Sequence, residues 1–92
     1  MSTVHFKKAF TMNLEDVRHG IEQLGQGLQK EHGLKYHWEG QHKAVFQHKA
    51  AKGHIAIKGN EIQLELKLGL MYAAMAPLIK SRIAAMADQY IS

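Results

Sequence analysis

Apolar and polar residues alternate between residues 34 and 68, in four short runs separated by turn residues. The apolar positions of these runs are Leu34, Tyr36, Trp38, Ala44, Phe46, Ile55, Ile57, Ile62, Leu64, Leu66 and Leu68. Successive side chains of a strand point to opposite faces, so such a run buries one face and exposes the other. The segment therefore predicts an antiparallel meander of four strands with a single apolar face.

Three short loops connect these runs and set the pairing between neighbouring strands. They lie at residues 40–42, at residues 50–51 and at Gly59-Asn60, a favoured kind of two-residue hairpin turn. The expected facing pairs are Trp38 with Ala44 and Tyr36 with Phe46, then Phe46 with Ile55 and Ala44 with Ile57, then Ile57 with Ile62 and Ile55 with Leu64. All three registers place the large apolar residues on one face, and a slip of one residue would destroy that agreement.

The opposite face of the meander follows from the same registers. It pairs Glu39 with Lys43, Lys58 with Glu61, and His54 with Glu65, and it places Val45 and Ala56 between them. Opposite charges that face each other across strands contribute about 0.2–1 kcal/mol per pair. This face is expected to be solvated.

The residues before the meander predict a strand and a helix. Residues 3–10 alternate like a strand, and a helix is expected over residues 14–31. Asn13 is a suitable N-cap for that helix, and Gly33 is a suitable C-terminal stop. The apolar stripe of the helix consists of Leu14, Val17, Ile21, Leu24 and Leu28.

The chain changes character after Gly69, which ends the last strand. Residues 70–79 are apolar on every side, and Pro77 suits either the first turn of a helix or a kink within one. The terminal helix is expected to pack on the apolar sheet face beside the first helix, although residues 70–79 carry more apolar surface than that face can cover. The predicted fold is α+β, in the order β-α-β-β-β-β-α, with an antiparallel sheet and two helices on one face.

The composition restricts the class of protein. The chain has no cysteine, which excludes disulfides and thiolate sites, and its 92 residues predict a single domain, residues 1–92. The formal net charge of +4 comes from scattered residues, which argues against a nucleic-acid partner. The apolar run 70–79 falls short of the ~20 residues that span a bilayer. We therefore expect no membrane span.

The side chains that could carry chemistry do not converge. The meander contains four histidines, His37, His42, His48 and His54. No three of them meet in the predicted register, and no carboxylate pair joins them at ligand spacing, so we expect no metal and no cofactor. His54 beside Glu65 resembles an oriented base, but no nucleophile faces it. The sequence predicts a protein that is not an enzyme.

Two groups of apolar residues are candidates for contact with a ligand or partner. The first is Leu70, Met71, Tyr72, Met75 and Leu78, where flexible methionines suit an adaptable apolar surface. The same segment would also suit a buried helix or a homodimer interface. The second group is Tyr36, Trp38 and Phe46, which share the inner sheet face with core residues and could line a pocket between sheet and helices.

The order of several motifs resembles a known family. The motifs are Tyr36-x-Trp38-x-Gly40, Gly53-x-Ile55-x-Ile57, Glu61-Ile62-x-Leu64-x-Leu66, Leu68-Gly69-Leu70, and Pro77-Leu78-Ile79 followed by Ile83. Together with the opening strand and the leucine-rich helix, they resemble the polyhydroxyalkanoic acid system proteins over about residues 3–91. The architecture is also similar to a shortened helix-grip domain, in which a curved sheet wraps a long C-terminal helix.

The resemblance implies a bacterial, cytoplasmic protein connected with polyhydroxyalkanoate storage granules. The family takes its name from genes near those for polymer synthesis and granule proteins, and its motifs supply no catalytic residues. Our leading hypothesis is a non-enzymatic accessory protein whose apolar segment 70–79 contacts the granule surface or a granule-bound protein. The alternative is a small module that binds an apolar ligand between sheet and helices.

Overall fold

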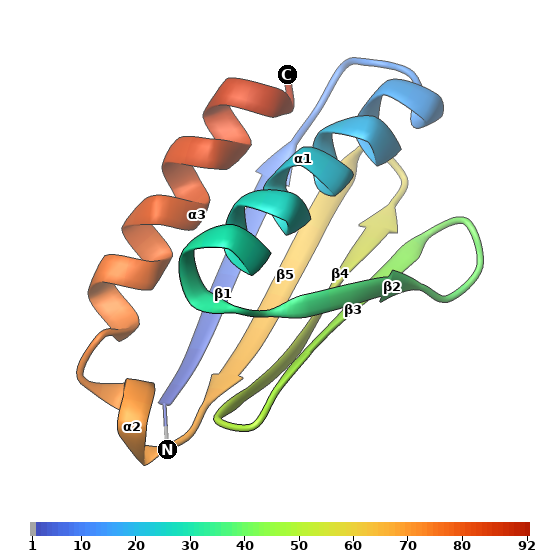
Figure 1. Ribbon diagram of the computed structural model, residues 1–92. Coiled ribbons are helices and arrows are strands. Elements are labelled where there is room, and N and C mark those ends of the chain that lie inside the picture. Colours follow the sequence, from blue (N-terminus) through green and yellow to red (C-terminus); the bar gives the residue numbers. More distant parts are fainter. Residues whose placement is uncertain (1) are drawn as a thin grey trace.

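The computed structural model describes residues 2–92 and contains a five-stranded antiparallel sheet (Figure 1). Its strands are β1 (Ser2–Ala9), β2 (Lys35–Trp38), β3 (Lys43–His48), β4 (Ala51–Lys58) and β5 (Glu61–Leu68). They lie in the order β1-β5-β4-β3-β2, so β1 extends the meander at its β5 edge. Met1, the first residue of the predicted domain, lies outside the described residues.

Two of the three predicted hairpin registers are confirmed, and the third is wrong by two residues. The confirmed pairs are Tyr36 with Phe46, Trp38 with Ala44, Ile57 with Ile62, and Ile55 with Leu64. Between β3 and β4, however, Phe46 faces Gly53 and Ala44 faces Ile55, because the turn is Lys49-Ala50. An even error leaves every side chain on its assigned face, so the predicted inner and outer faces are correct.

Pairing to β5 and a side-chain hydrogen bond explain the corrected turn. Ala51 pairs with His48 on one side and with Leu68 on the other, so a turn at residues 50–51 would remove Ala51 from both ladders. The backbone N–H of Ala50 donates to Nδ1 of His48 at 3.1 Å. The predicted outer-face pairs are unaffected. Lys58 faces Glu61 and His54 faces Glu65. The backbone N–H of Glu39 donates to the carbonyl of Lys43, and their side chains form an ion pair.

The first helix, α1 (Leu14–His32), begins at the predicted residue and ends one residue later than predicted, before the predicted stop at Gly33. The side chain of Asn13 accepts a hydrogen bond from the backbone N–H of Asp16 at 2.9 Å. Gly33 ends the helix in the left-handed conformation, with φ 72°, and its N–H donates to the carbonyl of Gln29. These two caps satisfy helix-end groups that would otherwise lack partners.

The N-cap gives a direct stability test. Asn13→Ala is expected to lower the free energy of unfolding by about 0.5–2 kcal/mol, because the N–H of Asp16 loses its acceptor. Urea unfolding followed by circular dichroism measures the change. Asn13→Ser keeps an acceptor and should remain within a few tenths of a kcal/mol of the parent. Equal losses in both variants would contradict a capping role.

The C-terminal region forms two helices, where the sequence predicted one. These are α2 (Leu70–Ala73) and α3 (Ala76–Tyr90), with Pro77 in the first turn of α3. In a continuous helix, Pro77 could not donate to the carbonyl of Ala73, and its ring would clash with that carbonyl. Helix α2 ends at Ala73, so the break removes this conflict.

Helices α1 and α3 lie side by side on the apolar face of the sheet, as predicted (Figure 1). The helices approach closely at Gly20, where an added Cβ would lie 2.6 Å from the carbonyl oxygen of Tyr90. The largest fully buried side chains are Phe46, Ile21, Leu24, Leu28, Ile55, Ile62, Leu66, Leu68, Ile83, Ile91 and Val17. Both helices and the inner face of the sheet contribute to this core.

An ion pair also connects the two helices. The guanidinium of Arg82 donates two hydrogen bonds to the carboxylate of Glu31, at 3.0 and 2.7 Å. These hydrogen bonds lower the pKa of Glu31 and raise the pKa of Arg82. The pair has the bidentate geometry typical of arginine and carboxylate groups, and it connects the exposed sides of α1 and α3.

Candidate contact surface

The aromatic candidates lie in the interface between sheet and helices. Phe46 is only 1% exposed, and its ring is tilted against that of Tyr36 with 6.0 Å between centroids. The Tyr36 ring lies against Gly25 of α1, where an added Cβ would lie 2.9 Å from it. These contacts pack sheet against helix. None of these contacts favours the alternative hypothesis of a ligand pocket.

Trp38 is half-buried and held by two side chains of α1. Its indole N–H donates to the carboxylate of Glu22 at 3.1 Å. The guanidinium of Arg18 lies 4.6 Å from the centre of the ring, in the geometry of a cation–π contact. These contacts bind the short edge strand β2 to α1.

The apolar segment 70–79 divides into exposed and packed residues. Leu70 is 85% exposed, Met71 is 83% exposed and Leu78 is 55% exposed. Tyr72 and Met75 are half-buried and pack against the core. A single exposed apolar side chain is ordinary, but adjacent exposed apolar side chains such as Leu70 and Met71 form a patch of the kind that marks interaction sites. Of the five contact residues predicted in this segment, three therefore face solvent.

Helix α2 is fixed to the hairpin that joins β3 and β4. The Tyr72 ring lies 5.6 Å from the ring of His48 on β3, measured between centroids. The N–H of Gly69, which precedes α2, donates to the carbonyl of Ala50 in the hairpin turn at 2.7 Å. These contacts keep Leu70 and Met71 at the end of the sheet where the β3–β4 turn also lies (Figure 1).

Lysines from three parts of the chain gather at this same end. Lys49 in the turn, Lys52 on β4 and Lys67 on β5 line an open hollow of about 240 Å³ next to Gly69. Lys52 and Lys67 face each other directly across the two strands. All three side chains are exposed, and the ion pairs found within residues 2–92 include none of them. We call Lys49, Lys52, Lys67, Leu70 and Met71 together the basic-apolar tip.

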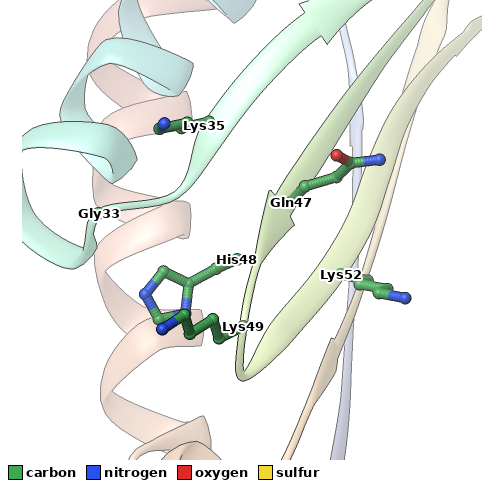
Figure 2. A pocket seen from close by; sticks show the side chains of 6 residues that line it. All are labelled: Gly33, Lys35, Gln47, His48, Lys49 and Lys52. Atoms are coloured by element: carbon green, nitrogen blue, oxygen red, sulfur yellow. The ribbon is translucent and has the colours of Figure 1, made fainter.

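A second, larger hollow adjoins the tip and is also basic. Its volume is about 660 Å³, and its lining residues are Gly33, Lys35, Gln47, His48, Lys49 and Lys52 (Figure 2). It is open to solvent, and its lining includes no carboxylate. In Figure 2 the side chain of Lys52 points away from His48, toward the other face of the sheet. The basic side chains therefore surround the end of the β3–β4 hairpin.

The basic-apolar tip is a feature that our reading of the sequence missed. A signal was present, because the Gly59-Asn60 turn alone sets Lys52 opposite Lys67. Like charges that face each other across strands destabilise a sheet, so such a pair is a reason to look for an anionic partner. The position of Lys49 depended on the β3–β4 turn, which the sequence analysis placed incorrectly.

Two other features, a cluster of metal ligands and a membrane-spanning helix, are not found within residues 2–92. Within residues 2–92, no three histidine, aspartate or glutamate side chains are grouped so that they could hold a metal ion. No helix among these residues is both long enough and apolar enough to cross a bilayer.

The comparisons with known proteins give a family. No curated protein and no solved structure is similar enough to the chain to count as a match. One family model, described as "Putative polyhydroxyalkanoic acid system protein", matches residues 4–91 and so covers almost the whole chain. The match confirms the resemblance that the core and turn motifs indicated. The chain therefore belongs to the polyhydroxyalkanoic acid system protein family.

Proposed function

We propose that the protein is a non-enzymatic accessory protein of polyhydroxyalkanoate storage in the cytoplasm, and that it contacts the granule surface through Leu70 and Met71. The family name supports the connection with the polymer system. The observation that carries the proposed contact is the exposure of these two side chains, 85% and 83%, at the start of α2. Leu78 on α3, which is 55% exposed, extends the apolar surface.

Two physical features support such a contact, namely the free energy of burying Leu70 and Met71 and the ordered position of α2. Burying a Leu or Met side chain contributes about 1.5–3 kcal/mol, so the pair would supply about 3–6 kcal/mol before the costs of association. Helix α2 is already held by Tyr72 and by the hydrogen bond from Gly69 to Ala50, so little ordering is needed on binding. The expected association is reversible, which suits an accessory protein on a changing surface.

Granule fractionation tests the proposal. In cells that accumulate the polymer, the parent protein should sediment with the granules, and Leu70→Ser/Met71→Ser should move most of it to the soluble fraction. Leu14→Ser is the matched control, because Leu14 is 39% exposed at the start of α1, away from α2 (Figure 1). If the parent protein stays in the soluble fraction, or if the double variant still sediments like the parent, the proposal is wrong.

A further inference from the structure

We infer that the basic-apolar tip binds an anionic lipid interface, with Leu70 and Met71 inserted among the acyl chains and the three lysines at the headgroups. The inference rests on the proposed contact function and specifies the chemistry of the contacted surface. Its basis is that α2, with its exposed apolar pair, lies at the same end of the fold as three lysines that take part in none of the ion pairs among residues 2–92 (Figure 1).

The lysines are placed by the fold in spite of their mutual repulsion. Lys52 and Lys67 are direct cross-strand partners, and Lys49 lies in the preceding turn, where the carbonyl of Ala50 accepts a hydrogen bond from Gly69. Counted back from Leu68 at the tip end of β5, the first carboxylate is Glu65, which faces His54 on β4. An anionic surface would relieve the repulsion between the lysines, whereas water alone only screens it.

The combination of charges with exposed apolar side chains selects lipid over other anionic partners. A nucleic acid would use the lysines and leave Leu70 and Met71 in water. A stable protein partner would require an interface of about 1,200–2,000 Å², whereas α2 contributes four residues and the neighbouring hollows are open. Basic side chains around an inserted apolar group are typical of proteins that lie on anionic lipid surfaces.

Vesicle flotation tests the inference with the whole chain. The protein should float with vesicles of mixed phosphatidylglycerol and phosphatidylcholine, and its binding should weaken steeply as salt is added. The triple variant Lys49→Gln/Lys52→Gln/Lys67→Gln should lose affinity on the order of 100-fold, because each lysine near such a surface contributes about a fivefold factor. Leu70→Ser/Met71→Ser should also lose binding.

A control variant removes the same number of positive charges at the opposite end of the sheet. Lys7, Lys43 and Lys58 lie toward the opposite end of the sheet, near the Gly59-Asn60 turn, and their triple change to Gln should alter affinity by less than about threefold. Equal losses in the two triple variants would overturn the inference, since net charge would then explain binding. So would equal binding to vesicles of phosphatidylcholine alone, or binding to duplex DNA that needs the lysines but not Leu70 and Met71.

The outcomes separate this inference from the proposed function. If granule sedimentation depends on Leu70 and Met71 but no vesicle is bound, the lipid inference is wrong and the granule contact stands. If anionic vesicles are bound through the tip but the protein never sediments with granules, the lipid inference stands and the granule contact is wrong.

Discussion

Phe46→Ala is expected to lower the free energy of unfolding by about 3–5 kcal/mol, the largest effect of any substitution considered in this protein. The ring is 1% exposed and packs against Tyr36 in the layer between sheet and helices. Its removal would leave a cavity that the two flanking strands and α1 can fill only in part. A domain of this size has a total stability of about 5–15 kcal/mol, so the variant should lose a large fraction of its stability.

This substitution also separates the two hypotheses that the sequence left open for the aromatic group. If Phe46 lined an empty ligand pocket, its truncation would remove few contacts and cost much less. Chemical unfolding of the purified protein gives the difference. Met71→Ala is the control, because Met71 is 83% exposed and its loss should change stability by less than about 0.5 kcal/mol. A cost below about 1 kcal/mol for Phe46→Ala would revive the pocket hypothesis.

Gly53→Ala is expected to lower the free energy of unfolding by about 3 kcal/mol, although it adds only one methyl group. A Cβ at position 53 would overlap the carbonyl oxygen of Glu65 and lie 2.8 Å from the Cα of Leu66. Both atoms belong to the backbone of β5, so no side-chain rotation can make room. The strands β4 and β5 would have to separate at this point.

Gly27→Ala is the matched control for Gly53. At Gly27 an added Cβ would meet Sδ of Met86 at 2.6 Å, and the flexible end of that side chain can move. Alanine is also favoured over glycine in a helix by about 1 kcal/mol, which offsets the adjustment. Equilibrium unfolding in urea should therefore show a large loss for Gly53→Ala and a small change of either sign for Gly27→Ala. Similar values for the two variants would show that β4 and β5 are not so closely packed at Gly53.

Local signals predicted most of the fold correctly. The Asn13 cap, the Gly33 stop and the Gly59-Asn60 turn each depend on residues that are near one another in sequence, and the structure has all three. Pro77 was a local signal for the start of α3, because proline disfavours an uninterrupted helix from residue 70, but this signal did not distinguish a break from a kink. The predicted β3–β4 turn was wrong because the pairing of Ala51 with Leu68 on β5, which fixes its position, is not local, although the hydrogen bond from Ala50 to His48 is.

The candidate site was less accessible to sequence reasoning. Residues 70–79 are apolar on every side, so no periodicity distinguishes the residues that pack from those that face water. The contact of Tyr72 with His48 and the exposure of Met71 were decided by where α2 meets the β3–β4 hairpin. The basic-apolar tip combines residues 49, 52 and 67 with α2, and only the assembled sheet brings them to one end.

The sequence by itself determined the face of every strand, because the alternation of side chains is a property of the backbone and survives an error of two residues in register. It also determined the ends of α1 and the family of the chain. The tertiary structure alone decided where β1 pairs, how closely β4 and β5 approach at Gly53, and which apolar side chains of residues 70–79 remain in water. These features depend on contacts between distant segments, whose spacing is set by the packing of the whole core.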